Sequence, residues 1–188
     1  PPLEARGGTA RVALYFNSTK FSWISGENAL LHRERLTKSS FLSHSHQDKV
    51  IFYNVYNFTS SNAELAIALL STLRDSILRD LNNHPNATII AAGDFNSPIW
   101  PHAHHDATRR RIQAALLQLT QSLNMRDILS NLGASNETWR GIGARAQSSS
   151  KIDHILVIGN TYKWNRADII PNVDSDHSYL HLSHTSGK

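Results

Sequence analysis

The sequence contains no cysteine among its 188 residues, which excludes disulfide bridges and thiolate metal sites. No apolar run approaches the roughly 20 residues that a membrane-spanning helix needs, so we expect no association with a membrane. The opening residues 1–4 have neither the basic nor the apolar region of a secretory signal. We therefore expect an intracellular protein.

The residues that are present indicate one globular domain with a mildly basic surface. Hydrophobic residues make up 40% of the chain, which is enough for one domain with a core. Lysine and arginine outnumber aspartate and glutamate by 19 to 15, and the formal net charge is +4 with 11 histidines. A basic domain of this kind suits a polyanionic partner, although many basic domains bind none.

Apolar periodicity predicts two long helices. The first follows Asn62 as its cap, ends before His84 and carries apolar residues at three- and four-residue spacing. These residues are Leu65, Leu69, Leu70, Leu73, Ile77, Leu78 and Leu81. The second helix spans residues 109–123, with Asp106 or Thr108 as its cap. Its predicted core face is formed by Ile112, Leu116, Leu119 and Leu123.

Short strands are predicted between and around these helices. They span residues 9–17, 21–24, 41–45, 49–56, 88–92, 138–140, 152–158, 164–169 and 179–182. A charged stretch separates the second strand from the third, and residues 126–132 are predicted to form a short helical turn. Strands alternate with two long helices and no repeat or linker interrupts them. The pattern indicates a single α/β domain over residues 1–188.

The strand at residues 88–92 leads into the most informative stretch of the chain. Its apolar, partly β-branched run predicts a strand buried on both faces, and Gly93 then allows the backbone to turn. Asp94 and Asn96 are two residues apart, so in an extended chain both point to the same side. A carboxylate and a carboxamide would then lie at the carboxyl end of a buried strand, where open α/β folds bind ligands. A turn of Asx type that merely ends the strand is the alternative, and this stretch alone does not decide between the two.

Three further polar positions lie at the ends of apolar runs. Asp176 and His177 are adjacent, so the acid can hold a metal ion or a tautomer while the imidazole engages a phosphate. Asp153 opens one apolar strand, and Tyr56 ends another.

Taken in order, these motifs resemble the endonuclease/exonuclease/phosphatase superfamily, whose members cleave phosphodiesters or phosphomonoesters with Mg²⁺. The motifs are Gly-Asp-Phe-Asn at residues 93–96, Lys-Ile-Asp-His at 151–154 and Ser-Asp-His at 175–177. Within the superfamily, Gly-Asp-Phe-Asn-Ser-Pro-Ile-Trp at residues 93–100 looks most like the endonuclease domains of LINE-type retrotransposons. The resemblance covers residues 6–182 and implies two packed mixed sheets flanked by helices, with the site where sheet ends meet.

The resemblance also implies a role for each matched residue. Asp94 would orient or deprotonate the attacking water, and Asn96 would donate to a nonbridging phosphate oxygen. His177 would stabilise that same oxygen, and Asp153 would bond to His177 and raise its pKa.

Asp176 would be a ligand of Mg²⁺, with Mn²⁺ as an alternative, because hard cations prefer carboxylate oxygens. Tyr56 would donate to a phosphate. Plainer interpretations also exist, in which Tyr56 is an interfacial core aromatic and Asp153 only caps a strand.

Basic and aromatic residues near the central motif predict contacts with DNA. Arg109, Arg110 and Arg111 open a helix, where positive charge is unfavourable with the helix dipole, which suggests a use such as phosphate binding. Trp100 and His102 lie in the loop before them. A solvated polar face is the alternative for the arginines. Zinc at the histidines of this loop is disfavoured, because the fixed second pair of a structural zinc site is missing.

One departure from the superfamily is evident near the amino terminus. Members carry an Asn at the end of the first strand and a metal-binding Glu in a Gln-Glu-like motif, and neither precedes Arg6 here. Glu4 and Glu27 stand in other contexts, and Asn17 follows the Gly-Gly segment, after both motifs should have passed. We therefore expect that the first strand-helix-strand portion is missing, that Mg²⁺ binds weakly and that the chain nicks DNA poorly or not at all.

Three functions remain compatible with these features. The first is a Mg²⁺-dependent DNA endonuclease of retrotransposon type, expected to be monomeric, and nuclear if it is part of a retrotransposon protein. The second is a phosphoesterase of the same superfamily that acts on another phosphate ester. The third is a non-catalytic, nucleic-acid-binding relic. Trp100 and the basic charge favour the first over the second, whereas the missing Asn and Glu favour the third over both.

Overall fold

The computed structural model describes residues 18–24, 29–32, 34–99, 106–134, 137–141, 148–159 and 162–185. The strand predicted at residues 9–17 lies outside these ranges, and so do Trp100 and His102. None of the described helices is long and apolar enough to cross a membrane.

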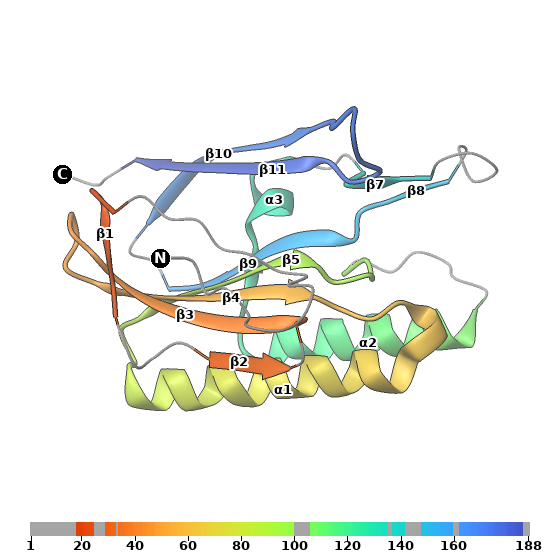
Figure 1. Cartoon of the computed structure of the whole chain (residues 1–188), viewed down its shortest axis with the longest axis horizontal. Helices are drawn as coiled ribbons and strands as arrows, with labels where there is room; N and C mark the ends of the chain where they lie inside the picture. Colours follow the sequence, from red (N-terminus) through yellow and green to blue (C-terminus); the bar gives the residue numbers. More distant parts are fainter. Residues whose placement is uncertain are drawn as a thin grey trace.

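Within the described ranges, seven strands form one mixed sheet (Figure 1). The strands are β1 (Phe21–Trp23), β2 (Ala29–His32), β3 (Leu36–Ser43), β4 (Lys49–Tyr56), β5 (Thr88–Asp94), β6 (Arg126–Asp127) and β9 (Asp153–Ile158). Their order is β1-β3-β4-β5-β9-β6, and β2 also pairs with β3. Strands β4 and β5 are parallel, whereas the other pairs are antiparallel.

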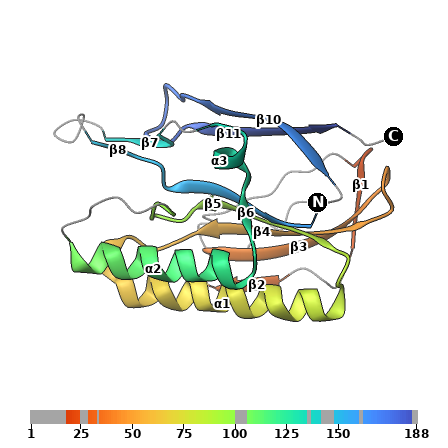
Figure 2. The ribbon, with the colours of Figure 1, turned by 180° about the vertical axis from the view of Figure 1, so that it is seen from behind.

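The remaining elements cover the two faces of this sheet. Helices α1 (Ala63–Asn83) and α2 (Ala107–Ser122) lie side by side along one face, and a short 3-10 helix, η1 (Ser60–Asn62), leads into α1. On the other face lie α3 (Ile128–Asn131) and the antiparallel pair β10 (Lys163–Ile170) and β11 (Tyr179–Thr185) (Figure 2). The short pair β7 (Trp139–Arg140) and β8 (Ser149–Ser150) lies at the end of this second layer. The predicted two-sheet α/β arrangement is therefore observed.

Helix α1 buries most of the predicted apolar stripe, but two of its leucines are exposed. Leu69, Leu73 and Ile77 are fully buried, whereas Leu65 and Leu78 are 46% and 42% exposed. The prediction for those two was wrong, because at about 100° per residue they lie roughly 80° and 140° from the direction of Leu73. Asn62 precedes the helix as expected, although its side chain makes no capping bond.

Helix α2 matches its predicted core face more closely. Ile112, Leu116, Leu119 and Leu123 are all buried. Asp106 is the cap, since its carboxylate accepts a hydrogen bond from the Thr108 backbone N–H at 2.8 Å.

A buried acid on α1 explains why β3 begins earlier than predicted. The strand starts at Leu36, within the charged stretch that was expected to interrupt it. The Lys38 ammonium lies 2.5 Å from the carboxylate of Asp80, and the Tyr53 hydroxyl donates to the same carboxylate. Burial and the bond to Asp80 raise the pKa of Tyr53 above its usual range. Lys38 and Tyr53 thus compensate the buried charge of Asp80, and these contacts join the sheet to α1.

Residues 126–132 also differ from the prediction of a single helical turn. Arg126 and Asp127 form the edge strand β6, paired with Val157 and Leu156 of β9, and only then does α3 begin. The Arg126 guanidinium donates to the Gly159 carbonyl at 2.6 Å, which holds this edge in place. Tertiary pairing therefore overrides the local helical preference here.

Gly93 is required by a close approach between strands. Strand β5 does not turn away at Gly93 as predicted, but continues to Asp94, with Gly93 at φ +135°. A Cβ atom on Gly93 would lie 2.0 Å from the carbonyl oxygen of Val55 on β4. The glycine thus permits the parallel pairing of β4 and β5 just before their polar ends.

We predict that Gly93→Ala lowers the free energy of unfolding by roughly 3 kcal/mol or more, because it combines backbone strain with a clash against main chain. Gly133→Ala is the matched control, because Gly133 also has positive φ, at +78°, but a Cβ there meets no atom within 4 Å. The control should cost about 1–2 kcal/mol. Urea unfolding of both variants measures the difference, and equal losses would contradict this account of Gly93.

Candidate active site

Three polar side chains form a row across the ends of adjacent strands. In the strand register Tyr56 of β4 pairs with Asp94 of β5, and Asp94 pairs with Asp153 of β9. Paired residues on neighbouring strands project from the same face of a sheet, so these side chains share one edge and one face. Residues of the predicted motifs that are far apart in the sequence thus lie close together at one edge of the sheet.

His177 reaches this row from the second layer. It lies between β10 and β11 and is held by backbone bonds that run from Arg140 to Asp176 at 2.8 Å and from Ser178 to Thr138 at 2.7 Å. Its Nδ1 lies 3.0 Å from Asp153 Oδ2, and its Nε2 lies 3.9 Å from Asp94 Oδ2. The structure therefore brings Asp94, Asp153 and His177 together from distant parts of the sequence.

The two carboxylates shift the pKa of His177 upward. The hydrogen bond to Asp153 is the largest cause, partial burial opposes it, and the charges of Asp153 and Asp94 add to it. The pKa of His177 is raised to about 9, so the imidazole is cationic at neutral pH.

The pKa of Asp94 is also raised, although a carboxylate that accepts hydrogen bonds usually has a lowered pKa. Burial raises its pKa most, and the negative charge of Asp153 raises it further, whereas the backbone bond from Asn96 lowers it. The resulting pKa of Asp94 is about 7. A carboxylate of this kind can exchange a proton near neutral pH.

Asn96 meets Asp94 through a tight turn rather than through an extended chain. Asn96 has a φ of +51°, its N–H donates to Asp94 Oδ1 at 2.7 Å, and its Nδ2 donates to Asp94 Oδ2 at 3.1 Å. Nδ2 also donates to the Asn57 carbonyl at 2.9 Å. Both amide hydrogens are thus used within the protein, and the atom left to offer is the acceptor Oδ1. The expected donation to a phosphate oxygen would require one of these bonds to break.

Asn57 is a site residue that sequence reasoning missed. It is fully buried, and its N–H donates to the Asp94 carbonyl at 2.8 Å while its Nδ2 donates to the Phe95 carbonyl at 3.1 Å. On the other side, the Phe95 N–H donates to the Ile152 carbonyl at 2.9 Å. The turn after β5 is therefore fixed to both neighbouring strands. An amide residue directly after the predicted strand at residues 49–56 was the available signal.

Tyr56 belongs to the row, but its ring packs against Arg35. The guanidinium carbon of Arg35 lies 4.6 Å from the Tyr56 ring centroid and 4.1 Å from that of Phe58. Arg35 also donates to the carbonyls of Tyr56 and Asn57, at 3.3 and 3.2 Å. The structure thus gives Tyr56 a packing role at the end of β4, whereas its predicted contact with a phosphate stays a prediction.

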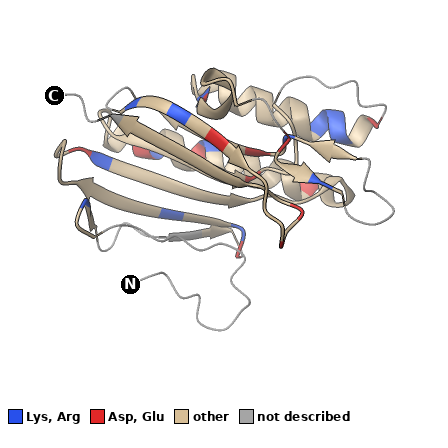
Figure 3. Cartoon of the chain, turned by 90° about the horizontal axis from the view of Figure 1, so that it is seen from above, with Lys and Arg blue, Asp and Glu red and all other residues tan. Residues whose placement is uncertain are grey.

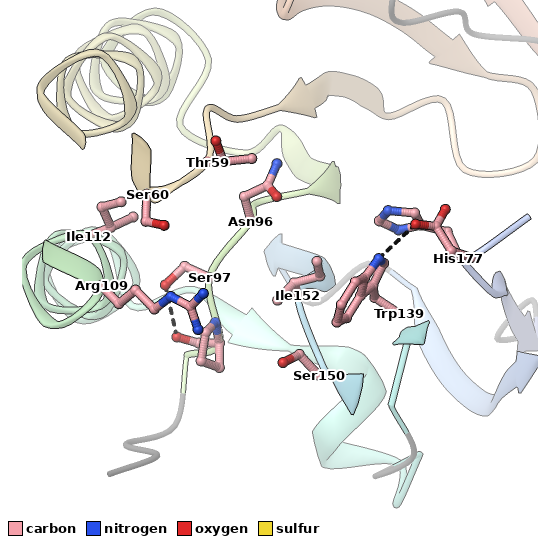
Figure 4. Close-up of a pocket in the computed structure, with 12 residues that line it drawn as sticks. Thr59, Ser60, Asn96, Ser97, Arg109, Ile112, Trp139, Ser150, Ile152 and His177 are labelled. Carbon is pink, nitrogen blue, oxygen red and sulfur yellow. Dashed lines mark hydrogen bonds between the residues drawn. The ribbon is translucent and has the colours of Figure 1, made fainter. Parts of the chain in front are cut away.

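A pocket of about 380 Å³ opens beside the row (Figure 4). His177 and Trp139 lie on one side of it, and Arg109 lies across from them. The complete lining is Thr59, Ser60, Asn96, Ser97, Pro98, Arg109, Ile112, Trp139, Ser150, Ile152, Asp176 and His177. The pocket thus combines a carboxylate, two basic side chains, hydroxyl groups and an aromatic ring.

The carboxylates of the site can hold a divalent cation. Among the described residues, Asp94, Asp153 and His177 offer ligand atoms that all lie within 4.8 Å of one another. The protonated imidazole cannot ligate a metal, so the carboxylates would do so. Burial and the charge of Asp153 raise the pKa of Asp94 although His177 lowers it, and a bound cation would stabilise the carboxylate further.

Asp176, the predicted metal ligand, occupies the pocket wall outside this group. Its Oδ2 accepts a hydrogen bond from the Trp139 indole at 2.9 Å, shown as a dashed line in Figure 4. This bond orients the carboxylate along the wall. The remaining lone pairs of the carboxylate are unaffected by this bond, so its predicted part in metal binding stays a prediction.

The three arginines of α2 form a continuous basic block along the helix in Figure 3, but their surroundings differ. Arg109 lines the pocket, with its Nε 3.7 Å from Asp106. Arg111 pairs with Glu64 of α1 at 2.7 Å. Arg110 is exposed and does not line the pocket. Successive helix residues diverge by about 100°, so the three side chains point in different directions.

Comparison with solved structures identifies the fold. A truncated TDP2 from Caenorhabditis elegans is 15% identical with a TM-score of 0.58, over 86% of this chain and 65% of that one. A mannosyl-6-phosphatase from Bacteroides thetaiotaomicron is also 15% identical, with a TM-score of 0.65 over 92% and 70%. TDP2 from D. rerio, complexed with a single-strand DNA product, is 14% identical with a TM-score of 0.61 over 89% and 69%. The chain thus has the endonuclease/exonuclease/phosphatase fold, and it spans 65% of the length of the truncated C. elegans protein.

A family described as endonuclease-reverse transcriptase matches residues 50–181, which extend from β4 to β11. The match includes the whole row of strand ends, the turn that carries Asn96 and the segment that carries His177. It covers well over half of the chain. The protein therefore belongs to the endonuclease-reverse transcriptase family.

Proposed function

We propose that this protein hydrolyses phosphodiesters in DNA with Mg²⁺, as the endonuclease domain of a retrotransposon protein. The observation that carries the proposal is the convergence of Asp94, Asp153 and His177 beside the pocket. Membership of the endonuclease-reverse transcriptase family supports it. Further support comes from D. rerio TDP2, a protein of the same fold that was captured with a DNA product.

The side chains of the site can divide the work of hydrolysis. Cationic His177 stabilises the negative charge that develops on a nonbridging phosphate oxygen. Asp94 accepts the proton of the attacking water, and Asn96 Oδ1 accepts its second hydrogen. A bound Mg²⁺, held by Asp94 and Asp153, would add positive charge beside the phosphate. Asp153 keeps His177 protonated and oriented toward the pocket.

A phosphomonoester is the second candidate substrate. The pocket of about 380 Å³ is small enough to enclose a single phosphate ester, and the B. thetaiotaomicron protein of this fold is a mannosyl-6-phosphatase. Release of inorganic phosphate from a sugar phosphate, without cleavage of DNA, would favour this second function over the first.

We predict slow nicking of supercoiled plasmid that requires Mg²⁺ and continues to rise through the millimolar range, because few protein oxygens hold the cation. His177→Ala should lower the rate by about 10²–10³-fold, since it removes the charge that faces the phosphate. Asp94→Asn should lower it at least as much. Gel electrophoresis of the nicked plasmid measures each rate.

Asp168→Asn is the matched control for this assay. Asp168 also pairs with a histidine, His181, at 3.1 Å, but it lies on β10, outside the residues that line the pocket. The control should keep the rate of the unchanged protein. Nicking that survives EDTA or Asp94→Asn would show that a contaminant or a different site is responsible.

We predict that His177 titrates near pH 9 and that Asp153→Asn moves its pKa below 9 toward the ordinary 6.5, because the bonded negative charge is lost. A histidine with a raised folded-state pKa stabilises the fold fully below pH 6.5. That stability is lost as the pH rises through about 9. NMR titration of the imidazole protons measures the pKa. Asp168→Asn should leave the pKa of His177 unchanged. An unchanged pKa of His177 in Asp153→Asn would refute its electrostatic coupling to Asp153.

We predict salt-sensitive DNA binding in which Arg109 contributes one phosphate contact from the pocket. Arg109→Ala should weaken binding and reduce the slope of log affinity against log salt by about 1. Arg111→Ala is the comparison, because Arg111 is already paired with Glu64. Fluorescence anisotropy at several salt concentrations measures both slopes, and equal effects of the two variants would argue against a specific role for Arg109.

A further inference from the structure

A second imidazole of the motif at residues 151–154 lies directly behind the site. His154 follows Asp153 in β9, and alternate residues of a strand point to opposite faces of the sheet. Asp153 faces the row of site residues, whereas His154 points to the other face and is only 1% exposed. The catalytic scheme proposed above makes no use of this buried titratable group.

His154 contacts the active-site turn on both sides of Asn96. Its Nε2 lies 3.0 Å from the carbonyl oxygen of Ser97, and its ring packs against Phe95 with centroids 5.7 Å apart. A carbonyl oxygen only accepts hydrogen bonds, so Nε2 carries the proton and donates it. Phe95 is fully buried and Ser97 is 3% exposed. Both flanks of Asn96 therefore rest on one side chain.

A polar network lies behind His154, although the His154 Nδ1 makes no hydrogen bond to it. Its Nδ1 lies 3.6 Å from Asp127 Oδ2, and the same carboxylate accepts a hydrogen bond from Ser130 at 2.6 Å. The Lys151 ammonium lies 3.6 Å from Asp127, and it donates to the Ser130 hydroxyl at 2.8 Å and to the Ala134 carbonyl at 2.9 Å. Burial alone would raise the pKa of Asp127, but His154, Ser130 and Lys151 together hold it below its usual value. The network is thus a charged anchor between β6, α3 and β9.

The turn needs such support because of its backbone conformation. Asn96 has a positive φ, which is unfavourable for a residue with a Cβ and persists only where the surroundings fix it. Asn57 holds the turn from the β4 side, and His154 is the side chain that holds it from the β9 side. A small displacement of this turn would move both Asp94 and Asn96 relative to the pocket.

We propose that His154 is a positioning residue that fixes the turn of Asp94–Ser97 in its reactive geometry. The inference rests on the proposed function, because the residue acts through Asp94 and Asn96 and does not touch the substrate. Its physical basis is the Nε2–H bond to Ser97 together with the contact to Phe95.

Two substitutions separate positioning from packing. In His154→Gln the side-chain amide can place an N–H near the position of Nε2 and keep the bond to Ser97. In His154→Asn the amide corresponds to the position of Nδ1, so it faces Asp127 but does not reach Ser97. Both variants remove the ring and its contact with Phe95. Only His154→Gln keeps the bond to Ser97, and only His154→Asn keeps a polar group that faces Asp127, so better performance of His154→Gln reports the bond to Ser97.

The first readout does not depend on activity. Hydrogen exchange of the Asn96 amide, which donates to Asp94 Oδ1, reports whether the turn is intact. We expect exchange about fivefold faster or more in His154→Asn, from the loss of one hydrogen bond, and near-native exchange in His154→Gln. Unchanged exchange in His154→Asn would overturn the proposal whether or not the protein cleaves DNA.

The second readout is the kinetics of nicking by the full 188-residue chain. His154→Asn should lower kcat by about 10–100-fold with little change in KM, because misplaced groups lose rate rather than binding. His154→Gln should recover most of kcat. Equal losses of kcat in both variants, in step with equal falls in Tm, would reduce His154 to a packing residue and overturn the proposal. An inactive parent chain would refute the proposed function, while the exchange experiment would still decide the role of His154.

Discussion

The pairing of β5 with a parallel neighbour on one side and an antiparallel neighbour on the other determines the geometry of the whole site. Backbone hydrogen bonds fix which residues of β4, β5 and β9 lie opposite one another, and they align Tyr56, Asp94 and Asp153. A shift of one residue in either register would turn a carboxylate to the opposite face. The position of the acids is therefore a property of the backbone ladder, which the packing of α1 and α2 stabilises from beneath.

The electrostatics of the site follow from this alignment. Two carboxylates held side by side in a partly buried row repel each other, and the structure resolves the conflict in two different ways. Asp153 bonds to a cationic imidazole, whereas Asp94 retains a raised pKa and a readily exchanged proton. Adjacent groups of the same chemical type thus acquire different roles, because the imidazole of His177 is hydrogen-bonded to Asp153 but lies 3.9 Å from Asp94.

Much of the fold was predictable because it depends on patterns that are local in sequence. The strand at residues 49–56 was predicted with its observed bounds, and the core face of α2 was confirmed. The convergence of Asp94, Asp153 and His177 was expected from the resemblance of their motifs to the endonuclease/exonuclease/phosphatase superfamily, and the structure brings the three together. The predicted polar interruption before β3 failed because Lys38 is neutralised by Asp80, a residue 42 positions away.

The details of the turn could not be predicted for a related reason. The positive φ of Asn96 and the use of both its amide hydrogens depend on Asn57 and on the exit from β4. The hydrogen bond from the Trp139 indole to Asp176 could not be predicted either, and the part of Asp176 in metal binding stays a prediction. The anchor behind His154 joins three elements and has no periodic signature at all. Such contacts arise only once the strands are paired.

The way in which Asn57 and Ile152 hold the turn also determines which sequence changes the site can absorb. Three of the bonds that fix it involve main-chain groups of the turn itself: the carbonyls of Asp94 and Phe95 and the N–H of Phe95. Every amino acid other than proline carries these groups, so exchange of the Phe95 side chain leaves the bonds in place. A change in chain length has the opposite effect. Insertion of one residue between Tyr56 and Asn57 would displace Asn57 from the turn, so we expect a fixed spacing between the end of β4 and this asparagine.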